Sequence, residues 1–283
     1  METYILTLKC PDRVGIVAAV SSFLAGNGGW ITEAHNHSDV FSGWFFLRQE
    51  IRADSLPFDL DSFRSRFEKL ASEFSMQWSI SESHTQKRVA VMVSTLDHCL
   101  SDIFHRRRSG EFNIDIPCVI SNHPELEEIC TWHNTPFHHV PMNAGSKQEA
   151  FKKIETLLDQ AEVDVIVLAR YMQIIPSELC DKYSNRIVNI HHGFLPSFSG
   201  ARPYHQAFHH GVKMIGATCH YVTADLDAGP IIDQDVVRVT HSDSIEKMVR
   251  LGRDIEQLVL ARGLRYHLED RILVHDGKTV VFG

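Results

Sequence analysis

Short, continuous apolar runs recur through the last two thirds of the chain, with helical segments between them. The first runs from Val89 to Val93, and others follow at 116–120, 163–168 and 187–190. A strand that is buried on both faces of a sheet has an unbroken apolar sequence rather than an alternating one. Between two of these runs, Lys147 to Ala161 repeats apolar side chains at helical spacing. The alternation predicts an α/β domain with a mostly parallel sheet that helices cover on both faces.

Residues 1–83 follow a different order: strand, helix, strand, strand, helix, strand. We expect strands at 4–9, 30–39, 44–51 and 76–80, a first helix that Asp12 caps, and an amphipathic second helix at 58–74. This order is the split βαβ, or ferredoxin-like, arrangement. A polar linker at 84–87 then separates a first domain, 1–83, from a second domain, 88–283.

Composition limits the partners and the compartment. The chain has 28 Lys and Arg against 36 Asp and Glu, a formal net charge of −8. This charge argues against nucleic acid as a partner, because neutralisation of phosphate dominates such binding. No apolar run approaches the ~20 residues of a membrane helix, and Met1 leads directly into a strand instead of a signal peptide. We therefore expect a cytoplasmic protein that does not bind a membrane.

Cysteine and histidine give no sign of a metal centre or a disulfide framework. The six cysteines are scattered without a CxxC pair, which is typical of reduced, buried thiols. The 18 histidines include three His-His pairs, but none has the spacing of metal ligands. We expect neither a metal nor another cofactor.

The chemistry is concentrated between Val188 and Val236. Asn189 and His191 lie two apart at the end of an apolar strand, so both side chains face the same way, whereas His192 is expected on the other face. Asp227 follows in a tight loop. A histidine beside a carboxylate can accept and return a proton, and an Asn amide can stabilise an oxyanion. Taken alone, Asn189 and His191 could equally be capping groups at the strand end; with Asp227 they form a candidate site for one-carbon acyl chemistry.

The Asn-x-His pattern, the Leu195-Pro196 pair after it and Asp227-Ala228-Gly229 downstream resemble the folate-dependent formyltransferase family. The resemblance covers residues from about 88 to 283 and implies a Rossmann-like domain in which Asn189, His191 and Asp227 are catalytic. It implies a pterin pocket between the segment 168–174 and the loop 223–227. One departure is Gly193, where the family usually carries Ser. The residues expected to bind substrate are Arg170, Met172, Gln173, Ile174, Leu195, Thr223, Ala224, Asp225 and Leu226.

The first domain resembles the ACT domain, on the turn Cys10–Val17 and the turn Asn27–Ile31. That family commonly pairs through its sheet and binds amino acids where it pairs. The resemblance therefore implies a homo-oligomer, and it makes an amino-acid effector a hypothesis. A module that only assembles the protein is the alternative.

The two domains in this order resemble the formyltetrahydrofolate deformylases. Stretches that carry the match include 97–100, 119–124 and 275–282. The resemblance implies hydrolysis of 10-formyltetrahydrofolate to tetrahydrofolate and formate, an activity that supports one-carbon and purine metabolism. Two alternatives are formyl transfer to a small amine and a catalytically silent folate or amino-acid sensor. Transfer to a sugar-phosphate amine is disfavoured, because the turn Ser94–His98 lacks the glycines of a phosphate cradle and carries an acidic Asp97.

Overall fold

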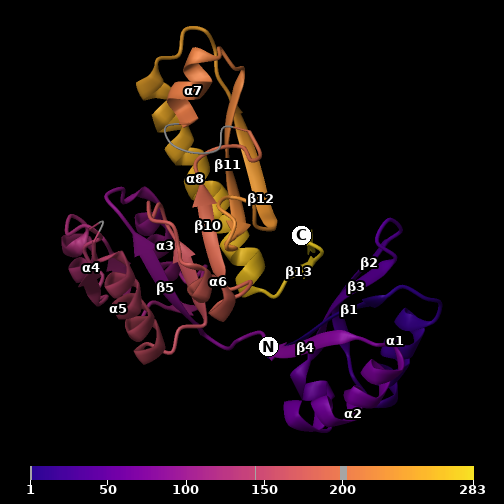
Figure 1. The fold of residues 1–283 in the computed structure, drawn as a ribbon. Helices are drawn as coiled ribbons and strands as arrows, with labels where there is room; N and C mark the ends of the chain where they lie inside the picture. Colours follow the sequence, from indigo (N-terminus) through magenta and orange to yellow (C-terminus); the bar gives the residue numbers. More distant parts are fainter. Residues whose placement is uncertain (1, 144, 198–202) are drawn as a thin grey trace. The chain divides into compact units, whose positions relative to one another are not determined.

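The chain folds into two compact units. The computed structural model describes residues 2–143, 145–197 and 203–283 (Figure 1). The first unit contains the chain up to Thr85 together with Tyr266–His275 and Thr279–Gly283, and the second contains Gln86–Arg265 with Asp276–Lys278.

The first unit is a four-stranded antiparallel sheet with the strand order β2-β3-β1-β4. The predicted βαββαβ order is confirmed. Its elements are β1 (Thr3–Pro11), α1 (Ile16–Gly26), β2 (Ile31–Asp39), β3 (Trp44–Arg52), the short 3-10 helix η1 (Ala53–Ser55), α2 (Leu60–Glu73) and β4 (Gln77–Glu82).

Both helices of this unit pack on one face of its sheet. Leu6 and Leu8 of β1 share a buried core with Val20 of α1 and with Phe63 and Phe67 of α2. Helix α2 begins at Asp59, whose side chain accepts a hydrogen bond from Ser62 N. The expected cap on α1 was wrong. β1 continues to Pro11, the helix begins after Gly15 in a left-handed conformation (φ 100°), and the Asp12 carboxylate instead accepts a hydrogen bond from the Ser38 hydroxyl.

The C-terminal segment packs against the sheet of the first unit. Helix α8 (Ile245–Leu268) leads into the hairpin β13 (Ile272–His275) and β14 (Lys278–Val281). Arg48 of β3, which is 1% exposed, donates 2.7 Å to Glu33 and also donates to the carbonyl of Glu269. Arg271 Nη1 lies 3.3 Å from Glu33 Oε1. We expected the second domain to extend to residue 283, whereas these ion pairs and hydrogen bonds join most of residues 266–283 to the first unit.

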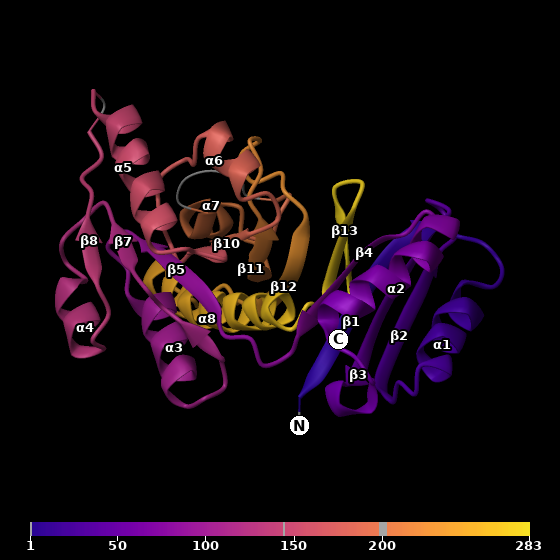
Figure 2. The same ribbon diagram turned by 90° about the horizontal axis from the view of Figure 1, so that it is seen from below.

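The second unit is built on a mostly parallel sheet with the strand order β12-β11-β10-β9-β5-β7-β8, and β6 pairs with β5. The predicted α/β architecture is confirmed. Figure 2 shows α3 and α8 on one side of this sheet and α5 and α6 on the other. Its remaining elements are β5 (Lys87–Val93), α3 (His98–Arg108), β6 (Ile114–Asp115), β7 (Val119–Ser121), α4 (Glu127–Trp132), β8 (Phe137–His139), α5 (Lys147–Gln160), β9 (Val165–Leu168), α6 (Ser177–Lys182), β10 (Ile187–His191), α7 (Pro203–His209), β11 (Met214–Tyr221) and β12 (Ile231–Arg238).

Strand β10 has a parallel neighbour on one side and an antiparallel neighbour on the other. Asn189 lies beside Leu168 of β9 and beside His220 of β11. Strand β9 therefore ends beside Asn189, whereas β11 runs the other way, carries His220 past Asn189 and ends beside Val188. This arrangement positions the candidate site.

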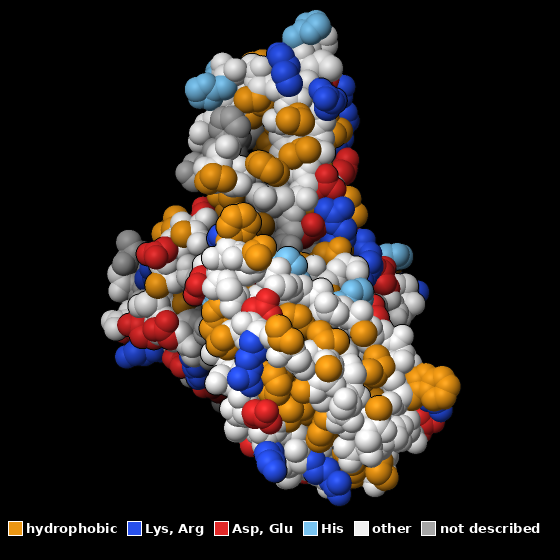
Figure 3. Space-filling view, turned by 90° about the vertical axis from the view of Figure 1, so that its right-hand side faces the viewer, with side chains coloured by type: hydrophobic (Ala, Val, Ile, Leu, Met, Phe, Trp, Pro, Cys, Tyr) orange, Lys and Arg blue, Asp and Glu red, His pale blue; other side chains and the backbone are white. Residues whose placement is uncertain are grey.

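The surface mixes charge and apolar side chains. On the face drawn in Figure 3, Lys and Arg side chains are interspersed with Asp and Glu. Val14, Trp30, Val40 and Phe41 are large apolar side chains of the first unit that are exposed. Among the helices that the structure describes, none is long and apolar enough to cross a membrane.

The ion pairs of Glu33 predict a pH-dependent stability. The hydrogen bond from His35 has the largest effect on the pKa of Glu33, and the hydrogen bond from Arg48 and the charge of Arg271 act in the same direction. Together they lower this pKa to about 2, although burial acts to raise it. A carboxylate whose pKa is depressed on folding stabilises the protein above its unfolded pKa of about 4.5, and this contribution is lost as the pH falls toward 2. We expect Glu33→Gln to lower stability at pH 7 by ~1–2 kcal/mol, after allowance for the partial exposure of Glu33.

Calorimetric unfolding of both proteins between neutral pH and pH 2 checks this prediction. The difference in melting temperature should shrink as the pH falls through this window. Glu68→Gln, on the exposed side of α2, is the matched control and should show no such difference. A constant difference across the window would contradict the role given to Glu33.

Candidate active site

A pocket of about 280 Å³ opens beside the end of β10. Three segments line it: the chain after β9, the end of β10 and the loop after β11. Its lining residues are Leu168, Arg170, Tyr171, Met172, Gln173, Ile174, Ile175, Asn189, Ile190, His191, His192, His220, Val222, Thr223, Ala224, Asp225, Leu226 and Asp227. An apolar cavity with a few convergent polar groups is the usual form of a small-molecule site.

The structure brings together the residues that the sequence singled out, with one exception. Asn189, His191 and Asp227 line the pocket, as do all the residues expected to bind substrate except Leu195. Leu195 is 4% exposed; its N–H donates to Thr218 Oγ1 and its carbonyl accepts from Gln234. It therefore supports the loop after β10 instead of forming the pocket wall.

His191 and Asp227 form an ion pair within the pocket. His191 Nδ1 lies 3.3 Å from Asp227 Oδ1, and the two side chains are 5% and 15% exposed. Asp227 has a left-handed backbone (φ 55°), which costs a non-glycine residue on the order of 1 kcal/mol. The loop keeps this conformation because Tyr221 N donates to Pro230 O, and because Gly229 packs so tightly that a Cβ would collide with the Tyr221 carbonyl.

The electrostatics favour an ionised Asp227. The hydrogen bond to His191 lowers the pKa of Asp227, and the nearby histidines add to this effect against the opposing effect of burial. His191 Nε2 is buried and has no hydrogen-bond partner among the residues that the structure describes. A buried ring nitrogen of this kind is free to interact with a ligand or a water.

His220 is a site residue that the sequence analysis missed. Its Nδ1 lies 2.8 Å from the Tyr221 carbonyl and donates to it, so Nε2 accepts from Asn189 Nδ2 at 3.0 Å. Burial lowers the pKa of His220, which keeps the ring neutral. His220 takes one N–H of the Asn189 amide, and no other described residue accepts the second N–H, which can therefore serve a ligand. Finding His220 from the sequence requires the antiparallel register of β11, which local patterns do not give.

The segment after β9 is fixed through its backbone. Met172 N donates 3.0 Å to Ser94 Oγ, and Ser94 Oγ donates 2.7 Å to Asn122. Met172 and Ile174 are 56% and 55% exposed at the pocket, and Leu226 on the facing loop is 62% exposed. These apolar side chains offer contact to a flat ring.

His192 also lines the pocket, although we expected it on the opposite face of the strand. It follows the last residue of β10, where the strand alternation no longer applies. Burial, together with the charge of Arg170, lowers the pKa of His192 to about 3. His192 is therefore a neutral wall residue at physiological pH.

Comparisons with known proteins agree with this geometry. The formyl transferase family matches residues 87–264. A formyltetrahydrofolate deformylase of Bacillus subtilis is 47% identical over 278 residues, which are 98% of this chain and 93% of the relative. The crystal structure of a formyltetrahydrofolate deformylase from Pseudomonas syringae pv. tomato has a TM-score of 0.98 and 61% identity, covering 100% of this chain and 95% of that chain. The chain belongs to the formyltetrahydrofolate deformylase family.

The deformylases share their second unit with transferases. A phosphoribosylglycinamide formyltransferase from Anaplasma phagocytophilum matches with a TM-score of 0.64 at 30% identity, over 70% of this chain and 96% of that chain. The deformylases of Bacillus subtilis and Pseudomonas syringae, in contrast, match along both units.

We predict that His220 positions the Asn189 amide. His220→Ala should lower kcat of the deformylase about 10- to 100-fold, because the Asn189 amide loses its orientation. KM should change little, because the apolar walls of the pocket remain. His220→Gln offers an acceptor oxygen at a similar reach and should recover part of kcat. Steady-state kinetics check this prediction. A raised KM with an unchanged kcat in His220→Ala would assign His220 to ground-state binding instead.

Proposed function

We propose that this protein hydrolyses 10-formyltetrahydrofolate to tetrahydrofolate and formate. The observation that carries the proposal is the His191–Asp227 ion pair beside Asn189 in a pocket with apolar walls. Relatives named formyltetrahydrofolate deformylase, which match almost the whole chain, support the same reaction.

In this proposal the pterin ring enters between the segment 170–174 and the loop 223–226. The exposed side chains of Met172, Ile174 and Leu226 give apolar contact. The backbone of the first segment, which Ser94 holds through Met172 N, supplies polar groups to the ring edge. The formyl group then lies toward Asn189, His191 and Asp227.

The reaction needs one acid–base pair and one oxyanion donor. His191 and Asp227 orient a water and take its proton as the water oxygen attacks the formyl carbon. The free N–H of Asn189 stabilises the oxyanion that develops. As the carbon–N10 bond breaks, His191 as imidazolium gives a proton to N10. Formate and tetrahydrofolate leave, and no covalent enzyme intermediate is formed.

The alternatives are less well supported. The turn after β5 employs Ser94 to hold Met172 N and carries Asp97 immediately before α3, which does not suit a phosphate-bearing amine. A silent sensor has no need of a buried His–Asp pair in the pocket. We therefore place hydrolysis ahead of transfer to a small amine and of sensing.

We further propose that the enzyme acts in the cytoplasm without a metal or other cofactor. In this proposal it assembles as a homo-oligomer through its ACT-like first unit, and it has neither nucleic acid nor membrane as a partner. An amino-acid effector at the first unit remains a hypothesis that rests on the resemblance of that unit to ACT domains.

The test is formate release from 10-formyltetrahydrofolate with no acceptor added. We expect release by the wild type, and a loss of about 100-fold or more in kcat for Asp227→Asn, because the neutral amide cannot hold a protonated His191. Asp181→Asn, on the exposed side of α6, is the matched control and should keep full activity. Formate release by Asp227→Asn at the wild-type rate would refute the assigned role of Asp227.

A further inference from the structure

A second polar cluster lies inside the second unit, beside Asn189, His191 and Asp227. It consists of His98, Arg170, Tyr204 and Glu256, from α3, the chain after β9, α7 and α8, and we call it the buried cluster. Glu256 is 1% exposed and accepts 2.6 Å from the Tyr204 hydroxyl. His98 Nε2 lies 2.8 Å from its other oxygen, and Arg170 Nε lies 3.5 Å from that same oxygen.

The ionisation of Glu256 depends on its neighbours. Burial works to raise the pKa of Glu256, but the hydrogen bond from His98, the Arg170 charge and the Tyr204 hydroxyl together lower it. Arg170 Nε and Nη1 are themselves buried and have no hydrogen-bond partner in the described part of the chain. The ion pair between Arg170 and Glu256 in this cluster is thus buried rather than exposed to solvent.

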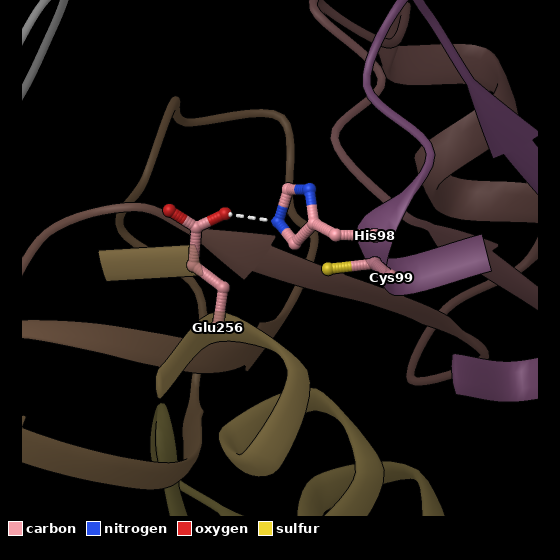
Figure 4. A group of neighbouring side chains, drawn as sticks. All are labelled: His98, Cys99 and Glu256. Atoms are coloured by element: carbon pink, nitrogen blue, oxygen red, sulfur yellow. Dashed lines mark hydrogen bonds and ion pairs between the residues drawn. The ribbon is translucent and has the colours of Figure 1, made fainter. Parts of the chain in front are cut away.

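A metal site is the first alternative for this cluster. Figure 4 shows His98 and Cys99 from the start of α3 facing Glu256 from α8. The possible ligand atoms of these three residues lie within 4.8 Å of one another. However, both oxygens of Glu256 already accept hydrogen bonds, and the Arg170 guanidinium next to them repels a cation. Burial, and next Glu256, raises the pKa of the Cys99 thiol well above its ordinary value, which disfavours the thiolate ligand.

The buried cluster adjoins the candidate catalytic residues through His192. The ring of His192 lies 5.3 Å from the ring of His191 and 6.2 Å from the ring of Tyr204, measured between centroids. Beyond His192 and Tyr204, a small cavity of about 30 Å³ remains. This is the space of about one water molecule and is too small for a substituted amine.

Helix α8 is adapted to the ring of Tyr204. Gly252 lies one turn before Glu256, and a Cβ at Gly252 would collide with the Tyr204 ring and hydroxyl. The missing side chain lets the ring pack closely against the helix, where its hydroxyl donates to Glu256. Packing against Gly252 and the hydrogen bond to Glu256 thus hold the Tyr204 ring in the wall beside His192.

We propose that the buried cluster determines the acceptor: by filling the wall beside His192 it admits water to the formyl carbon and excludes primary amines. This inference rests on the proposed hydrolysis and deepens it. In an opened wall, an amine nitrogen would attack the formyl carbon in place of water and lose its proton to the His191–Asp227 pair. The carbon–N10 bond would break, N10 would take the proton from His191, and an N-formyl amine would leave in place of formate.

The test measures which acceptor receives the formyl group. Enzyme, 10-formyltetrahydrofolate and either hydroxylamine or glycinamide are combined, and the ratio of N-formyl product to formate is determined. Tyr204→Ala and Arg170→Gly each remove a side chain from the wall. Each should raise the ratio for glycinamide about ten-fold or more over the wild type, because steric exclusion is relieved. Tyr204→Phe keeps the ring and should leave the ratio unchanged.

Arg170→Gly is a second variant that opens the same wall, in case Tyr204→Ala does not fold. Arg170 has a left-handed backbone (φ 65°) that suits glycine, so this variant gives the answer if Tyr204→Ala fails to fold. Tyr183→Ala makes a comparable cavity in the core on the other side of the sheet and should leave the ratio unchanged.

Two results would overturn the proposal: a wild-type ratio in Tyr204→Ala and Arg170→Gly while both still release formate, or ready N-formylation of glycinamide by the wild type. A wild type that releases no formate without an acceptor fails the proposed hydrolysis instead. The two failures are therefore distinguishable in one set of assays.

Discussion

The candidate active site depends on the position of β10 between a parallel and an antiparallel neighbour. The pairing with β9 brings the segment that begins at Arg170 to the polar end of β10, and the pairing with β11 brings His220 to Asn189. Side chains alternate along a strand, so a slip of one residue in β10 would turn Asn189 and His191 to the opposite face. The sheet register thus fixes His191 and the oxyanion donor Asn189 together, and the loop between β11 and β12 supplies Asp227.

Burial and the position of Asp227 give His191, His192 and His220 different roles. It lowers the pKa of His192 and of His220, so both rings are neutral, the first as a wall residue and the second as an acceptor for Asn189. His191 instead has Asp227 at 3.3 Å, and this carboxylate stays ionised and can stabilise an imidazolium. In our account, proton transfer is therefore confined to one histidine of the three.

Local sequence predicted the parts of the site that depend on short-range rules. Asn189 and His191 follow from strand alternation, and the α/β architecture follows from the apolar runs. Asp227 stands out as an acidic residue in a tight loop, and the family resemblance implies its catalytic role and the pterin-side segment. His220 and Glu256 could not be predicted, because their roles arise from pairing and packing between distant segments. The attachment of the C-terminal hairpin to the first unit was missed for the same reason, since it depends on Arg48, Glu33 and Arg271 meeting across the chain.

In the proposed reaction, water is the nucleophile at the formyl carbon. The most direct measurement is a single turnover of 10-formyltetrahydrofolate in water enriched in heavy oxygen, with mass analysis of the products. If water attacks, each formate molecule carries one heavy oxygen atom, and tetrahydrofolate is the other product. Unlabelled formate, or a formyl group recovered on an amine, would contradict the proposed reaction.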